Sequence, residues 1–182
     1  DAKKENIIDI VINSKVQRPG VCNALETLLM NNEIYQDMGN EVIEALLENG
    51  VELYVDKKII EDFPNLNLAN ELHYETEFLD LKLAIKLVDN VDEAIDHIKK
   101  YSSGHTEAIL TESNKVSETF AKSIDSSVIF INSSTRFTDG EMFGFGSEIG
   151  ISTQKLHVRG PMGLEALTNE RYVVTGEGTV RG

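Results

Sequence analysis

The sequence has little cysteine and no long apolar run, and both shortages limit what the protein can be. One cysteine among 182 residues cannot form a disulfide within the chain. No apolar run approaches the roughly 20 residues that a helix needs to cross a bilayer, so we expect no membrane span. Residues 1–6 lack the basic start and apolar stretch of a secretory signal, and the first residue is not methionine. We therefore expect a cytoplasmic chain that begins inside a longer protein.

Basic residues are also scarce, which argues against polyanionic partners. Lysine and arginine number 17 against 31 aspartates and glutamates, which gives a formal net charge of -14 and an isoelectric point near 4.6. Such a negative field repels nucleic acid and anionic lipid surfaces, so neither is an expected partner. An anionic substrate would need a local cluster of cations against this background.

The order of apolar segments predicts the fold class. Hydrophobic residues make up 41% and charged residues 26%, a composition typical of a soluble globular domain. Apolar strands alternate with amphipathic helices, which predicts an α/β fold with a mainly parallel sheet flanked by helices. The expected strands are residues 51–55, 81–88, 108–111, 128–132 and 172–175. The expected helices are residues 39–48, 91–100, 114–123 and 162–167 and one that begins at Asn23, while residues 7–14 fit either type.

The single cysteine is the first candidate for chemistry. A Pro-Gly pair precedes Cys22, and the apolar residues after Asn23 recur at helical spacing, so we expect Cys22 at the start of a helix. The positive end of a helix dipole favours thiolate over thiol and would lower the pKa of Cys22. A free cysteine is also among the residues most often buried for packing, so a purely structural role stays open.

Cations lie close to this cysteine in the sequence. Lys15 and Arg18 supply positive charge, and Gln17 supplies an amide donor. Together they would hold a thiolate and an incoming anion. The alternative is a basic surface turn on an otherwise acidic protein.

A long loop, residues 133–150, follows the strand expected at 128–132 and is rich in hydroxyl groups. Ligands in open α/β sheets bind at the carboxyl ends of strands, which places Arg136 where it could fork onto a carboxylate or phosphate. Three neighbouring hydroxyls could donate hydrogen bonds to the same ligand: Ser133, Ser134 and Thr135. Alternatively, Arg136 pairs with the acidic residue at 139 or 141 and only orders the loop.

Glycines and histidines give weaker signals. The glycines at 140, 144, 146 and 150 fit neither a P-loop nor a dinucleotide-binding fingerprint. The four histidines lack the spacing of metal ligands, so no metal site is expected. His105 alone is of interest, because it lies in a loop from which it could reach a site.

Five sequence blocks carry a specific resemblance to one enzyme family. They are residues 16–24 (VQRPGVCNA), 104–109 (GHTEAI), 134–140 (STRFTDG), 148–157 (EIGISTQKLH) and 159–168 (RGPMGLEALT). Together they resemble the gamma-glutamyl phosphate reductases, also called glutamate-5-semialdehyde dehydrogenases, which belong to the aldehyde dehydrogenase superfamily. The likeness covers essentially the whole chain.

The resemblance implies a domain organisation. Members of the superfamily have a Rossmann-like cofactor domain, a catalytic domain with the cysteine and an oligomerisation hairpin. Residues 1–168 would form the catalytic domain, and residues 169–182 would form a C-terminal oligomerisation strand and tail. The cofactor-binding domain precedes the cysteine in the family and would be absent from this chain. An intact enzyme would then be a homo-oligomer that pairs through the strand at 172–175.

The resemblance also implies the reaction and its residues. Cys22 matches the family nucleophile, and Glu77 resembles the glutamate that holds the ribose on the nicotinamide side of the cofactor. Arg18, His105 and residues 133–136 would surround the glutamyl group. The implied reaction is the NADPH-dependent reduction of L-glutamate 5-phosphate to L-glutamate 5-semialdehyde and phosphate, a step of proline biosynthesis, through a thioacyl intermediate on Cys22.

Two other interpretations stay open. One is another dehydrogenase of the superfamily that acts on a different acyl phosphate or on a plain aldehyde. The sequence around Arg136 argues against it, and we can assign no carboxylate to the activation of water that acid-forming aldehyde oxidation needs. The other is an inert catalytic-domain fragment whose site is incomplete.

Overall fold

A computed structural model describes residues 2–152, 154–155 and 157–182 of the chain, and residues 153 and 156 of the fourth resembling block lie outside the described part. Helices and strands alternate along the chain, as expected. The helices are α1 (Lys4–Val16), α2 (Asn32–Glu48), α3 (Lys57–Asp62), α4 (Glu71–Glu75), α5 (Val91–Tyr101), α6 (Asn114–Ser123) and the 3-10 turns η1 (Thr135–Phe137) and η2 (Glu165–Leu167). The strands are β1 (Thr27–Asn31), β2 (Glu52–Val55), β3 (Asn67–Leu68), β4 (Lys82–Val88), β5 (Thr106–Ile109), β6 (Val128–Ile131), β7 (Ile149–Ile151) and β8 (Gly160–Met162).

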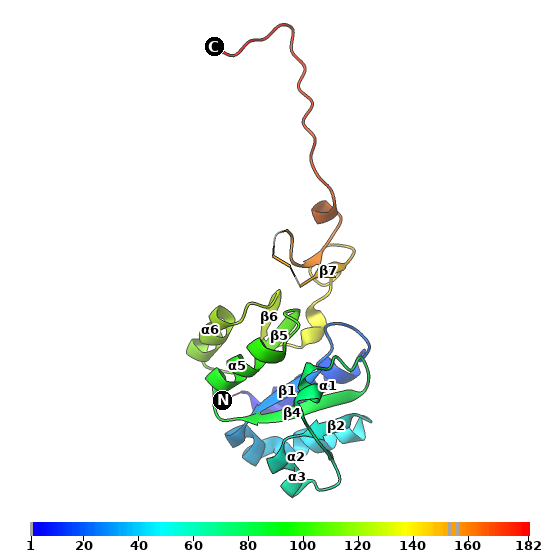
Figure 1. Cartoon of the computed structure of the whole chain (residues 1–182), viewed down its shortest axis with the longest axis vertical. Coiled ribbons are helices and arrows are strands. Elements are labelled where there is room, and N and C mark those ends of the chain that lie inside the picture. Colours follow the sequence, from blue (N-terminus) through cyan, green and yellow to red (C-terminus); the bar gives the residue numbers. More distant parts are fainter. Residues whose placement is uncertain (1, 153, 156) are drawn as a thin grey trace.

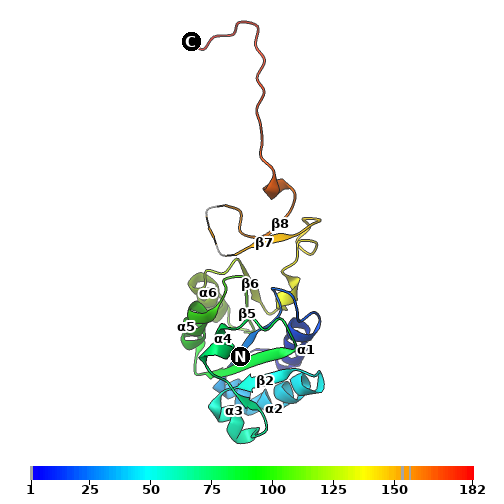
Figure 2. The ribbon, with the colours of Figure 1, turned by 45° about the vertical axis from the view of Figure 1, so that its right-hand side comes forward.

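Parallel pairing dominates the sheets. The main sheet has the order β1-β4-β2-β3, and every pair in it is parallel. Strands β5 and β6 form a second parallel pair, and β7 and β8 form an antiparallel hairpin. Figure 2 shows α2 and α3 on one side of the main sheet and α5 with α6 on the other. The predicted α/β architecture with a mainly parallel, helix-flanked sheet is therefore confirmed.

Local sequence signals set several helix ends. The side chain of Asn90 accepts the backbone N–H of Glu93 at the start of α5, and that of Ser113 accepts the N–H of Val116 at the start of α6. Such caps satisfy backbone donors that have no partner within the helix. Gly50, with φ of 75°, takes the left-handed conformation that ends α2 before β2.

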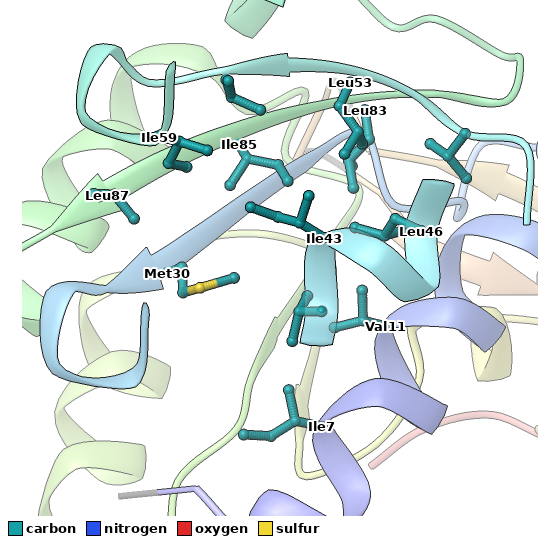
Figure 3. Packing of buried hydrophobic residues seen from close by; sticks show 13 residues of the cluster. Ile7, Val11, Met30, Ile43, Leu46, Leu53, Ile59, Leu83, Ile85 and Leu87 are labelled. Atoms are coloured by element: carbon teal, nitrogen blue, oxygen red, sulfur yellow. The ribbon is translucent and has the colours of Figure 1, made fainter. Parts of the chain in front are cut away.

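The main core lies between the sheet and the helices α1, α2 and α3 (Figure 3). Ile43 and Leu46 of α2 are completely buried against Leu83 and Ile85 of β4. Alternate residues of β4 face the opposite side of the sheet, where Lys86 forms an ion pair with Glu93 of α5. A smaller cluster between α5, α6 and the second sheet contains Ile95, Phe120 and Ile124.

The helix expected to begin at Asn23 does not form. Residues 21–24 make a turn, and residues 27–31 form β1 in parallel register with β4. Short apolar runs fit helix and strand patterns alike, and here pairing with β4 decides in favour of a strand. The helix expected at 162–167 is reduced to η2, because Met162 belongs to β8.

The end of the chain extends away from the folded body (Figure 1). Tyr172 is 84% exposed and Val174 is 91% exposed, and residues 172–175 have no sheet partner within the described part of the chain. A strand that pairs between subunits at 172–175 therefore stays a prediction. Among the described residues, no helix has the length and apolar character that a bilayer crossing needs.

Replacing a core leucine should cost far more than replacing an exposed one. Leu83 is completely buried, whereas Leu72 is 66% exposed. We expect Leu83→Ala to lower the free energy of unfolding by about 2–5 kcal/mol, because it removes buried apolar volume and leaves a cavity. Leu72→Ala, the matched control, should change it by less than about 0.5 kcal/mol. Urea unfolding followed by circular dichroism measures both, and equal costs would contradict the assigned core.

Candidate active site

Cys22 lies in an exposed turn between α1 and β1, not at the start of a helix. The turn stands at the amino end of β1, beside the amino end of the neighbouring parallel strand β4. A hypothetical side chain on Gly20 would lie 3.5 Å from the carbonyl oxygen of Leu79, so this turn packs against the segment that leads into β4. Exposure leaves the thiol accessible to a substrate.

The predicted lowering of the cysteine pKa is wrong for this chain. Partial burial and the nearby carboxylate of Glu148 raise the pKa of Cys22 above its ordinary value, and Glu77 adds to the rise. A hydrogen bond from the backbone of the cysteine itself and the positive charge of Arg136 act in the opposite direction. The helix dipole that was expected to favour the thiolate is missing because the turn begins no helix.

Arg136 contributes positive charge that lowers the pKa of the thiol, and polar side chains of the cysteine turn hold its guanidinium. Its Nε donates to Gln17 Oε1 at 2.7 Å, and its Nη1 donates to Asn23 Oδ1. Among the described residues, Arg136 forms no ion pair with Asp139 or Glu141, which was the alternative expectation. The guanidinium is therefore tied to the residue that follows Cys22 and not to its own loop.

Hydrogen bonds hold the hydroxyl-rich loop, residues 133–150, against α1 and the cysteine turn. Ser14 Oγ donates to Ser134 Oγ at 3.0 Å, deep in the structure. Asn23 Nδ2 donates to the carbonyl oxygen of Thr138 at 2.6 Å, and the hydroxyls of Thr138 and Thr106 lie 2.9 Å apart. The site therefore forms at the amino ends of β1, β4 and β5, and not at the carboxyl end of β6 where the sequence placed it.

The three predicted hydroxyl donors occupy different environments. The Ser134 hydroxyl accepts the backbone N–H of Arg136, so it caps η1 and orders the loop. Thr135 is buried, and its Oγ1 has no hydrogen-bond partner within the described chain. Ser133 is half-buried without a side-chain hydrogen bond among the described residues. Substrate contact by these hydroxyls stays a prediction, and Ser134 already has a structural role.

His105 lies next to the same group of charges, immediately before β5. Partial burial lowers the pKa of its imidazole, and the carboxylates of Glu148 and Glu77 partly oppose that shift. A neutral ring at neutral pH follows. Its Nδ1 lies 2.7 Å from the hydroxyl of Thr106, which connects it to the network of the loop.

The other two predicted cations, Lys15 and Arg18, lie in different environments. Lys15 is completely buried, and its Nζ lies 3.0 Å from Glu26 Oε2. It therefore neutralises a carboxylate and is not available to a substrate. Arg18 is exposed and, in the part of the chain that the structure describes, has neither a hydrogen bond nor an ion pair. A substrate contact by Arg18 stays a prediction.

The structure places two residues at the site that were not predicted from the sequence. Asn23 is buried and hydrogen-bonds both Arg136 and the Thr138 carbonyl, and its position directly after the cysteine is the signal that could have found it. Glu148 acts on the pKa values of Cys22 and His105 from far along the chain, so only the folded structure identifies it. Within the described residues, no group of acidic, histidine or cysteine side chains could hold a metal ion.

Known proteins resemble this chain in sequence and fold along nearly its whole length. No protein-family model matches the chain. A gamma-glutamyl phosphate reductase of Thermoanaerobacter sp. (strain X514) is 52% identical over 173 residues, which cover 95% of this chain and 42% of that protein. The crystal structure of gamma-glutamyl phosphate reductase from Thermotoga maritima is 49% identical with a TM-score of 0.91, covering 100% of this chain and 44% of that one. The chain belongs to the gamma-glutamyl phosphate reductase family.

A more distant structure supports the fold. Glyceraldehyde-3-phosphate dehydrogenase from Methanocaldococcus jannaschii, in complex with NADP, is 17% identical with a TM-score of 0.58, covering 74% of this chain and 38% of that one. Its likeness is confined to the fold, which is that of the aldehyde dehydrogenases. The chain spans less than half the length of all three proteins.

The charges around the thiol can be tested in the isolated chain by alkylation of Cys22 with iodoacetamide as a function of pH. Because Glu148 raises the pKa of the thiol, Glu148→Gln should shift the midpoint of the rate profile to lower pH. Because Arg136 lowers that pKa, Arg136→Gln should shift the midpoint to higher pH. Glu141→Gln removes a carboxylate from the same loop and should leave the midpoint in place. Shifts of the opposite sign would contradict the described geometry.

Proposed function

We propose that this chain supplies the nucleophile and the substrate contacts for the NADPH-dependent reduction of L-glutamate 5-phosphate to L-glutamate 5-semialdehyde and phosphate, a step of proline biosynthesis. The observation that carries the proposal is an exposed thiol beside a clamped guanidinium, in a chain 52% identical to a gamma-glutamyl phosphate reductase. A thiolate suits acyl transfer, and a guanidinium suits a carboxylate or phosphate.

Cys22 begins the reaction after its thiol loses a proton. The thiolate attacks the carbonyl carbon of the acyl phosphate, the bond from that carbon to the phosphate oxygen breaks, and phosphate leaves with the bonding electrons. A thioester on Cys22 remains. Reduction of the thioester carbon followed by loss of the thiolate releases the aldehyde, and the free thiol re-forms on protonation.

Arg136 is the side chain that we assign to the anionic substrate. Gln17 and Asn23 occupy its Nε and one Nη1 hydrogen, so its remaining N–H groups are free to bind a carboxylate or phosphate oxygen. The free hydroxyl of Thr135, together with Ser133, Ser134, His105 and Arg18, completes the assignment of glutamyl contacts. Because the protein carries a net charge of -14, a fixed local cation is what such a substrate needs.

Glu77 suits a contact with the cofactor. Its carboxylate is exposed and has no hydrogen bond or ion pair among the described residues, so both oxygens can accept ribose hydroxyls. It also lies within electrostatic reach of Cys22, where the nicotinamide must be for reduction of the thioester. When bound, NADPH would supply the hydride. The M. jannaschii structure that shares the fold is in complex with NADP, which supports a nicotinamide cofactor.

Assembly and location belong to the same proposal. We assign residues 1–168 to the catalytic domain and residues 169–182 to an oligomerisation strand and tail. The valines exposed at 173, 174 and 180 would be covered by pairing in a homo-oligomer. We expect the enzyme in the cytoplasm.

Removal of the thiol should abolish the reaction. In a protein of the relatives' full length that carries this segment, Cys22→Ser should reduce phosphate-dependent oxidation of glutamate 5-semialdehyde by about a thousandfold or more, because a serine hydroxyl is a far weaker nucleophile. NADP reduction at 340 nm measures the rate. Simple aldehydes serve as the control substrates and should react poorly with the unsubstituted protein. Full activity of the Cys22→Ser variant would refute the proposal.

The 182-residue chain alone should oxidise NADPH at a negligible rate in the presence of glutamate 5-phosphate. We assign only Glu77 of this chain to the cofactor, so these 182 residues offer few groups to hold the dinucleotide. Equilibrium binding of NADPH, followed by its fluorescence, should be correspondingly weak. Rapid turnover by the chain alone would show that the site is complete without further residues.

A further inference from the structure

An ion pair joins the two ends of the cysteine turn, with Lys15 completely buried and the Glu26 side chain 19% exposed. Lys15, in the last turn of α1, is 0% exposed, and its Nζ lies 3.0 Å from Glu26 Oε2. Removing two charges from water is costly, and an apolar pair of similar volume is often as stable or more so. Stability alone therefore does not account for a charged pair at this position.

The second oxygen of Glu26 has a different partner. Glu26 Oε1 accepts the backbone N–H of Leu79 at 3.2 Å. Leu79 has φ of 52°, in the left-handed region that a side chain with a Cβ atom disfavours. One carboxylate thus joins α1, the cysteine turn and a strained backbone position in front of β4.

The strained position belongs to the segment that carries Glu77. Burial raises the pKa of Glu26, and Lys15 opposes that rise together with hydrogen bonds from the backbone of Leu79 and Phe78. Glu77, directly before Phe78, is exposed and acts on the pKa of Cys22. The course of the backbone at 78–79 therefore decides where the Glu77 carboxylate lies.

We propose that Glu26, neutralised by Lys15, is a positioning residue: it fixes the strained backbone at Leu79 and so holds Glu77 at the cofactor side of Cys22. The cofactor half of this inference rests on the function proposed above. The positioning half does not, since it concerns only residues of this chain.

Two double variants separate positioning from stability. Lys15→Met with Glu26→Gln removes both charges but keeps an oxygen that can accept the N–H of Leu79. Lys15→Met with Glu26→Leu removes the same charges and also removes the acceptor. The two variants match in charge and nearly in volume, so they differ chiefly in the hydrogen bond to Leu79.

The pH profile of Cys22 alkylation in the 182-residue chain reports the position of Glu77 without any cofactor. Because Glu77 raises the pKa of the thiol, adding Glu77→Gln should shift the midpoint to lower pH in the unsubstituted chain and in the Glu26→Gln double variant. In the Glu26→Leu double variant the shift should shrink or vanish. An equal shift in all three backgrounds, no shift in the unsubstituted chain, or loss of the shift in both double variants overturns the proposal.

Hydrogen exchange in the unsubstituted chain keeps the proposal falsifiable if the Glu26→Leu variant does not fold. The Leu79 amide should be protected by its bond to Glu26, although it lies outside any helix or strand. Exchange at the rate of an unstructured amide would overturn the proposal.

The cofactor half is tested in a protein of the relatives' full length. The KM for NADPH should rise about tenfold in the Glu26→Leu double variant, the scale expected when the ribose loses its hydrogen bond to the charged Glu77 carboxylate. In the Glu26→Gln double variant the KM should stay within about twofold of the unsubstituted value. An unchanged KM alongside a displaced Glu77 would leave the positioning intact and overturn the assignment of Glu77 to the cofactor.

Discussion

Parallel pairing between β1 and β4 is the constraint on which the site depends. Thr27 lies opposite Ala84, so the turn before β1 and the segment before β4 must meet at the same edge of the sheet. Cys22 lies in the first and Glu77 in the second. The ion pair of buried Lys15 and partly exposed Glu26 then connects the two through hydrogen bonds, which fix their relative position.

The hydroxyl-rich loop joins this edge through polar bonds because it has few aliphatic side chains to bury. Asn23 accepts a hydrogen bond from Arg136 and donates one to the Thr138 carbonyl, and Ser14 donates one to Ser134. Each bond links a residue of the cysteine turn or α1 to a residue more than a hundred positions later in the chain. Arg136 is thereby held where its positive charge lowers the pKa of the thiol in a markedly acidic protein.

Local periodicity predicted much of the fold. The strands in the ranges 51–55, 81–88 and 128–132 and the helices at 91–100 and 114–123 form within two residues of their expected limits, because caps and apolar patterns act over short distances. The segment after Cys22 was mistaken for a helix, since its leucines fit both periods and only β4 decides between them. The wrong pKa prediction for Cys22 has two sources: no helix begins at the cysteine, and the burial and distant carboxylates that raise the pKa are visible only in the folded chain.

The sequence by itself determined the α/β class, the family and the identity of the candidate nucleophile, because strand and helix patterns and the motif blocks are local properties of the chain. Tertiary structure alone decided that Lys15 is buried against Glu26, that Asn23 holds Arg136 and that Glu148 opposes ionisation of Cys22. Charge effects and hydrogen bonds depend on distance in space. Residues that are 11 to more than 100 positions apart in the sequence come close enough to interact only after the strands pair and the loop packs against the edge of the sheet.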